Sequence, residues 1–98
     1  MAVTICTSVY YNPVFDKDGN LDDHEGFMQF HDCWVIPTVG SEFICTSTRD
    51  DNGNYHNKVM RKFEGIVEKV IYEYDETGHD SLSNRRTMYV EIYVRGKP

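Results

Sequence analysis

Short turn sequences recur along the chain, and no long helical pattern lies between them. Each combines Gly with Asp, Asn, Ser or Thr, residues that tolerate positive φ or hydrogen-bond to their own backbone. They occupy residues 17–20, 39–41, 51–54 and 75–78. The intervening segments are rich in Val, Ile, Tyr, Phe and Thr, which pack well on a pleated sheet. The sequence therefore predicts an all-β fold.

About five strands are expected, and the last has the clearest alternation. Over residues 87–95, apolar side chains at even positions alternate with larger or polar ones at odd positions. The other expected strands are residues 3–11, 26–36, 41–48 and 59–74. A short helix over residues 57–63 is an open alternative for the start of the fourth, because Val59, Met60 and Phe63 would share one side of it.

The length of 98 residues leaves no room for a second independent core, so residues 1–98 form a single domain. A chain of this size removes exposed strand edges by curling a strongly twisted sheet into a barrel. We therefore expect a small antiparallel five-stranded barrel of the SH3-like type, or a strongly twisted sheet.

The acidic composition restricts the classes of partner. The chain has 10 Lys and Arg against 16 Asp and Glu, a formal net charge of −6. Direct, non-specific nucleic-acid binding needs clustered cations. The two small basic groups, within residues 58–62 and at Arg85 and Arg86, are too weak to supply them. A protein partner is therefore expected in place of nucleic acid.

Cysteine content and hydropathy bear on location. Three cysteines, Cys6, Cys33 and Cys45, cannot close a full set of disulfides, and we expect them to be buried free thiols. No segment approaches the ~18 consecutive apolar residues of a membrane helix. The N-terminal segment lacks the charged and apolar regions of a signal peptide. These features predict a cytoplasmic protein that does not associate with membranes.

Two motifs carry a resemblance to known sequences. The segment PTVG at residues 37–40 precedes an expected strand, and FEGIVEKV at residues 63–70 lies within another. Together they resemble short uncharacterised proteins of phages and mobile elements, in which a P-x-V-G turn precedes a strand and a G-x-V-x-x-V strand follows. The resemblance implies a small β fold and a phage-like origin. It transfers no catalytic residue, since that group has no established activity.

Possible metal ligands do not form a recognised pattern. Residues 16–25 and 50–54 alternate oxygen-bearing side chains, but the Gly and the bidentate Glu of a calcium loop are not where such a loop needs them. His31 and Cys33 would share a strand face, yet the closely paired spacing of zinc ligands is missing. Possible further ligands are His24, His56 and His79. We therefore expect no metal and no cofactor.

Catalysis has equally little support. Cys33 as a nucleophile would need His31 and an orienting acid, but Asp32 projects from the opposite face of the expected strand. No catalytic motif is found, and we expect no enzyme and no catalytic residue. A metal- or thiol-dependent hydrolase using His31 and Cys33 is kept as an alternative. Asp32 itself falls on an apolar face, where a buried carboxylate can mark a binding site.

The tyrosines are the best functional clue. The chain has seven, more phenolic surface than so small a core readily hides. Tyr89 and Tyr93 lie opposite the apolar side of residues 87–95, and exposed Tyr beside Arg is typical of protein-recognition surfaces. The candidate binding residues are Tyr89, Tyr93, Arg95, Arg85, Arg86 and Asp32. The alternative is that these rings cover the open ends of a barrel.

The favoured function is a non-enzymatic module that docks on a protein partner, with a phage-type accessory or inhibitor protein as its narrower form. A second hypothesis is a homo-oligomer that binds or sequesters a small ligand such as a nucleotide. Tyr stacking together with Arg85 or Arg86 would serve that role.

Overall fold

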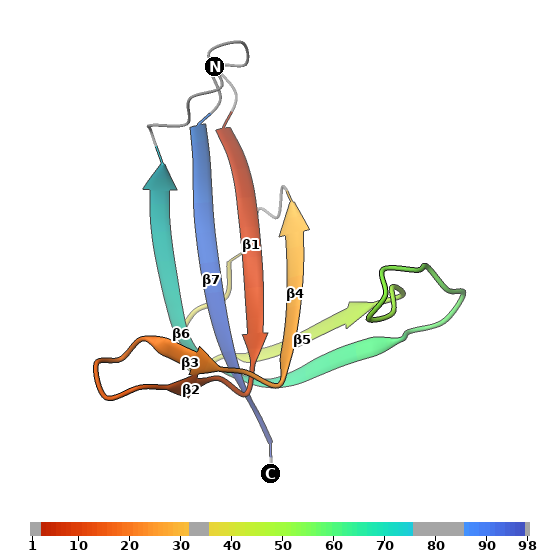
Figure 1. Ribbon diagram of the computed structural model, residues 1–98, viewed down its shortest axis with the longest axis horizontal. Coiled ribbons are helices and arrows are strands. Elements are labelled where there is room, and N and C mark those ends of the chain that lie inside the picture. Colours follow the sequence, from red (N-terminus) through yellow and green to blue (C-terminus); the bar gives the residue numbers. More distant parts are fainter. Residues whose placement is uncertain (1–2, 32–35, 76–85, 98) are drawn as a thin grey trace.

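The computed structural model describes residues 3–31, 36–75 and 86–97, and within them it contains strands, turns and loops but no helix. The strands are β1 (Val3–Tyr11), β2 (Val14–Phe15), β3 (Leu21–Asp23), β4 (Gly26–His31), β5 (Glu42–Ser47), β6 (Arg61–Asp75) and β7 (Arg86–Gly96). Five of them form one sheet in the order β4-β1-β7-β6-β5, and β2 pairs with β3 in a separate hairpin (Figure 1). The all-β prediction is confirmed.

The five-stranded sheet is mixed. β1 and β7 run parallel, with Ile5 opposite Met88 and Val9 opposite Ile92, while the other neighbouring pairs are antiparallel. The expectation of a purely antiparallel sheet is therefore wrong at this pair. Alternation of side chains predicts which face of a strand is buried, but it carries no information on the direction of its neighbour.

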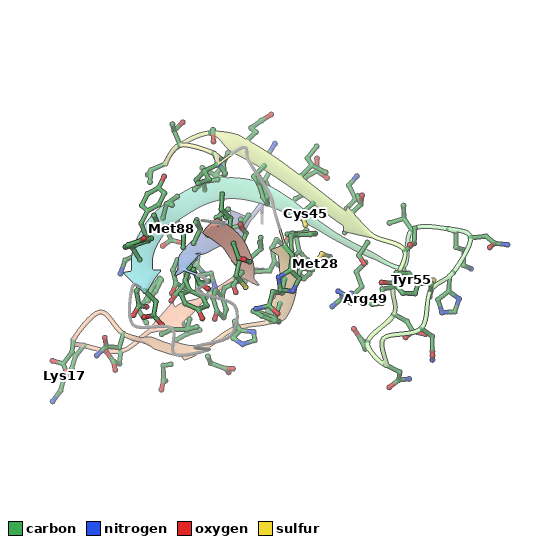
Figure 2. The ribbon with its side chains drawn as sticks, turned by 90° about the horizontal axis from the view of Figure 1, so that it is seen from above. Lys17, Met28, Cys45, Arg49, Tyr55 and Met88 are labelled. Atoms are coloured by element: carbon green, nitrogen blue, oxygen red, sulfur yellow. The ribbon has the colours of Figure 1, made fainter. Side chains whose placement is uncertain are left out.

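A bend in β6 curls the sheet into a half-barrel. The first part of this strand pairs with β5 and the second part with β7, and the register shifts between Val67 and Lys69. The two parts therefore run in different directions, and β5 crosses the concave face of the other strands (Figures 1 and 2). At the bend, Gly65 has no side chain because the backbone of Arg95 occupies the place where a Cβ would lie.

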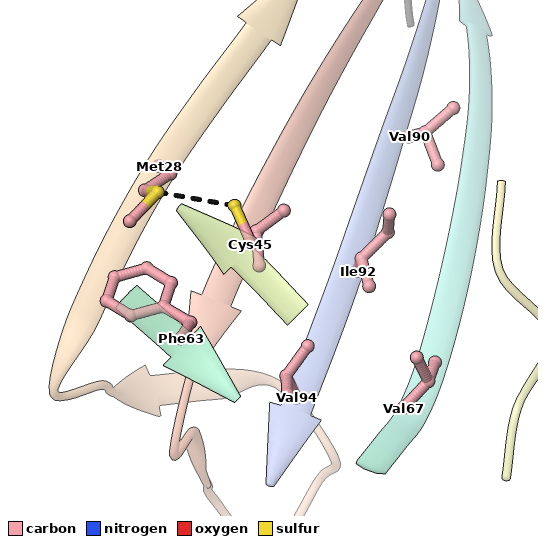
Figure 3. Packing of buried hydrophobic residues seen from close by; sticks show 8 residues of the cluster. Met28, Cys45, Phe63, Val67, Val90, Ile92 and Val94 are labelled. Atoms are coloured by element: carbon pink, nitrogen blue, oxygen red, sulfur yellow. Dashed lines mark hydrogen bonds between the residues drawn. The ribbon is translucent and has the colours of Figure 1, made fainter. Parts of the chain in front are cut away.

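The core fills the concave face. Its buried residues come from five strands and are shown in Figure 3: Val9, Met28, Cys45, Phe63, Val67, Val90, Ile92 and Val94. The apolar side of residues 87–95 thus faces the core, as its alternation predicts. Cys6 and Cys45 are buried, as expected, whereas Cys33 lies outside the described residues.

Side-chain contacts, and not backbone pairing, join β4 to β5 and β6 at the other end of the strand order. The Cys45 thiol donates to Met28 Sδ at 3.3 Å (Figure 3). Arg61 Nη1 donates to the carbonyl of Phe27 at 3.0 Å. These contacts close the half-barrel at the end where β4 begins.

The alternative helix over residues 57–63 is wrong. Residues 61–63 begin β6, and Met60 N–H donates to Ser47 O at 2.8 Å, which continues the β5–β6 pairing toward the loop. β-sheet pairing with β5 satisfies backbone groups that a one-turn helix would leave exposed. The expected strand 26–36 is β4 up to His31; residues 32–35 lie outside the described residues, as do residues 76–78 of the last predicted turn.

Candidate binding surfaces

The predicted binding residues do not form one surface. Asp32 and Arg85 lie outside the described residues, and Arg86 is the first residue of β7. Tyr89 is 40% exposed on the outer, convex face. Tyr93 and Arg95 lie farther along the same strand, where the β2–β3 hairpin covers the sheet.

Tyr93 is buried, at 3% exposure, so the expectation that it belongs to an exposed face is wrong. Its ring stacks on Tyr10 with centroids 5.1 Å apart and lies 5.2 Å from the ring of Phe15 in the hairpin. Its hydroxyl is hydrogen-bonded to the Glu91 carboxylate. Burial, and then this carboxylate, raise the pKa of Tyr93 well above its usual value. The sequence prediction missed β2 and β3, which are too short to alternate visibly.

Arg95 is exposed, but its polar contacts hold the base of the hairpin. Its Nη2 donates to Pro13 O at 2.7 Å, and its Nε lies 2.9 Å from a carboxylate oxygen of Glu68. Lys69 adds a cation–π contact, with Nζ 5.1 Å from the centroid of Phe15. This part of the convex face is therefore a second packed layer, whereas the alternative placed the rings over the open ends of a barrel.

A different region projects from the body of the protein. Residues 48–60, which join β5 to β6, extend well beyond the half-barrel and are here called the extension (Figures 1 and 2). The radius of gyration is 14.9 Å, against about 13 Å for a compact chain of this length.

Internal hydrogen bonds order the extension around Asp50. Its Oδ1 accepts the N–H groups of Asn52 and Asn54, each at 2.9 Å, and its N–H donates to Asn54 O at 2.9 Å. Its Oδ2 lies 2.7 Å from His56 Nε2. These bonds, that of His56 first, lower the pKa of Asp50 from its ordinary value. Gly53 supplies the positive φ of the turn.

The extension carries apolar side chains that the core does not use. Among the large hydrophobic side chains that the structure describes, Tyr55 is the most exposed, at 77%. It forms an isolated bridge with Arg49, whose guanidinium lies 5.9 Å from the ring centroid (Figure 2). Val59 and Met60 at the other end of the extension are also exposed. An ordered loop thus presents an aromatic ring to solvent.

The extension lacks the negative excess of the chain as a whole. Over residues 48–60 the side chains of Arg49 and Lys58 balance the carboxylates of Asp50 and Asp51, whereas the whole chain has a net charge of −6. Two further basic residues follow at the start of β6: Arg61 donates to the carbonyl oxygens of Arg49 and Phe27, and Lys62 pairs with Glu64 at 3.4 Å. The extension itself therefore carries no net charge.

A second candidate site is an apolar groove inside the half-barrel, here called the groove. It has a volume of about 220 Å³ and lies between β5 and the inner face of the sheet. Its lining residues are Thr7, Val9, Phe30, Phe43, Ile44, Cys45, Thr46 and Ile92. Thr7 is 1% exposed, and its Oγ1 has no hydrogen-bond partner among the residues that the structure describes.

The described part of the chain brings together no group of three His, Cys, Asp or Glu that could hold a metal ion. His31 is exposed at the end of β4, and the proposed partners Cys33 and His79 lie outside the described residues. Residues 3–31, 36–75 and 86–97 likewise include no helix long and apolar enough to cross a membrane.

Sequence reasoning missed both Tyr55 and Thr7 as candidate site residues. A signal existed for each. Tyr55 is an aromatic residue placed directly after the turn 51–54, where no strand face can bury it. Thr7 is a polar residue on the otherwise apolar side of the first strand, beside Ile5 and Val9.

Comparison with known proteins gives no relative from which to transfer a function. No family model, no curated protein and no solved structure matches the chain.

Proposed function

We propose that the protein is a non-enzymatic binding module whose extension docks on a protein partner. The observation that most supports this is the position of Tyr55. Its ring is 77% exposed on a loop that is internally hydrogen-bonded. Isolated surface aromatics are common, but here the ring stands on a projecting, ordered hairpin beside Arg49.

Order in the free protein favours docking through such a loop. Binding costs free energy when mobile side chains and loops must become fixed, and a loop already held by Asp50 avoids part of that cost. Tyr and Arg are enriched among residues that dominate binding energy, because they bury a large area and keep a polar group. Tyr55 and Arg49 provide this pair, and Val59 and Met60 expose further apolar area on the extension.

The exposed residues of the extension indicate the chemistry of the partner. Arg49 and Lys58 balance Asp50 and Asp51, so the extension has no net charge with which to attract a phosphate backbone. The exposed ring of Tyr55 needs an apolar pocket, which a protein surface supplies and a nucleic-acid backbone does not.

Affinity measurement with matched Tyr variants tests this proposal. The protein is used as bait, its stoichiometric partner is identified and purified, and the Kd is measured for the wild type and two variants. Tyr55→Ser is expected to weaken binding by roughly 30-fold or more, as loss of a dominant contact does. Tyr72→Ser, which truncates another exposed Tyr (58%) outside the extension, is the control and is expected to bind normally.

Three outcomes contradict the proposal: equal affinities of wild type and Tyr55→Ser, an equal loss in both variants, and a bound species that nuclease removes. The last would identify nucleic acid as the ligand.

The finer expectations from the sequence stay predictions. They are a relationship of the half-barrel to SH3-like barrels, a phage-type accessory or inhibitor role, and a cytoplasmic location. The docking proposal depends on none of them, because it rests on the residues of the extension.

A further inference from the structure

The groove differs from the extension in chemistry and position. Its walls are apolar side chains of β1, β4, β5 and β7, and its volume is about 220 Å³. For comparison, an apolar cavity of roughly 150 Å³ takes up benzene. The groove therefore has room for one substituted aromatic ring or a short aliphatic chain.

Thr7 is the feature that a purely structural groove does not explain. On the inner face of β1, its neighbours Ile5 and Val9 are apolar, and its side chain is almost completely buried. A buried hydroxyl normally has a hydrogen-bond partner, because losing water without replacement is unfavourable. Thr7 Oγ1 has none among the described residues. A Val in place of Thr7 would fill the same space without burying an unpaired hydroxyl.

We infer that the groove binds a small, largely apolar molecule with a single hydrogen-bonding group, and that Thr7 Oγ1 is the partner of that group. The hydroxyl and the methyl group of Thr are attached to the same Cβ. A step between staggered rotamers of Thr7 moves Oγ1 into the position that the methyl group held, and Thr7 is one of the residues that line the groove. The remaining walls contact the apolar part of the molecule.

The position of the groove makes this site independent of the docking surface. Thr7 and Ile92 lie on the central strands β1 and β7, whereas Tyr55 lies in the extension beyond the end of β5. Small-molecule sites are typically concave, mostly apolar, and supplied with few polar groups that set orientation. The groove has these properties, and Cys45, one of its lining residues, is held by its contact with Met28.

Titration with two related probes tests the inference. p-Cresol and toluene share the ring and methyl group, but only p-cresol has a hydroxyl. Each is added to isotopically labelled protein, and the amide signals are followed by NMR. p-Cresol is expected to shift the amides of Val9, Phe43 and Ile92 in the groove and to bind more tightly than toluene.

The Thr7→Val variant separates a specific site from simple hydrophobic uptake. It keeps the shape of the side chain and removes the hydroxyl, so the preference for p-cresol over toluene is expected to fall roughly fivefold, the effect of one hydrogen bond. Thr4→Val changes the opposite face of β1 and is expected to leave the preference unchanged. Native-like amide dispersion in each variant verifies folding.

The inference is overturned if neither probe shifts the groove amides up to its solubility limit. It is equally overturned if Thr7→Val keeps the full preference for p-cresol, or if the shifts map to the outer cluster around Tyr10 and Tyr93. None of these results bears on Tyr55, so failure of this site and failure of the docking proposal are distinguishable.

Discussion

The ring of Phe63 occupies the space where a side chain at Gly26 would begin. A Cβ on Gly26 would lie 2.6 Å from Phe63 Cζ, closer than atoms pack without displacement. The same ring stacks with that of Tyr11 at a centroid distance of 4.9 Å. β4 and the start of β6 are not paired in a ladder, so this contact is a main means by which the half-barrel closes.

Replacing Gly26 tests that closure. Gly26→Ala is expected to lower the free energy of unfolding by about 1–3 kcal/mol, the usual cost of overpacking a filled site. Urea denaturation followed by circular dichroism measures the change. In the double variant with Phe63→Leu, the Ala is expected to cost markedly less, because the smaller side chain leaves room for it. Strictly additive effects would show that the two residues do not interact.

Truncation of two Tyr residues on one strand separates the outer packed layer from the exposed surface. Tyr93→Ser is expected to lower the free energy of unfolding by about 3 kcal/mol, because it empties a site between Tyr10 and Phe15. Tyr89→Ser removes an exposed ring and is expected to change the free energy of unfolding by about 0.5 kcal/mol or less. Thermal and urea unfolding of both variants measure these effects. Similar stabilities would contradict the assignment of Tyr93 to a packed layer.

The sequence predicts individual strands well, because alternation depends on a single buried face. β1 has the expected bounds, and β7 differs from its expected range by one residue at each end. Alternation does not show which residues pack against the other face of a strand. Tyr93 was therefore expected to be exposed, since the covering hairpin has strands of only two and three residues. The closure through Gly26 and Phe63 involves residues 37 positions apart, and local patterns do not encode such pairs.

The order of the extension is expected to depend on acidification. Its hydrogen bonds lower the pKa of Asp50 in the folded protein, so the ionised form stabilises the loop. This contribution is complete above the ordinary pKa of an Asp and is lost as the pH falls through the lowered value. NMR titration of the Asp50 carboxyl is expected to give a midpoint below the ordinary value.

His56→Ala is the matched variant for that titration. It removes the largest cause of the shift, so the midpoint of Asp50 is expected to rise toward the ordinary value. The backbone bonds from Asn52 and Asn54 should preserve part of the shift. An unchanged midpoint would mean that His56 does not hold Asp50 in solution.

Removal of the Thr7 hydroxyl is expected to stabilise the free protein. Thr7→Val replaces a buried polar group that has no partner by an apolar group of similar shape, a change worth about 1 kcal/mol. The thermal midpoint should rise, and Thr4→Val on the other face of β1 should not raise it. A lower midpoint for Thr7→Val would show that its hydroxyl makes a stabilising hydrogen bond in solution.

Amide hydrogen exchange of the purified complex tests the docking account most directly. Exchange is compared in the free protein and with the captured partner bound. The account predicts that slowing of exchange is concentrated in residues 48–60, around Tyr55, while the exposed residues 72–74 of β6 exchange as in the free protein. Protection at residues 72–74 with an unchanged extension would contradict the account, because the partner would then bind a different surface.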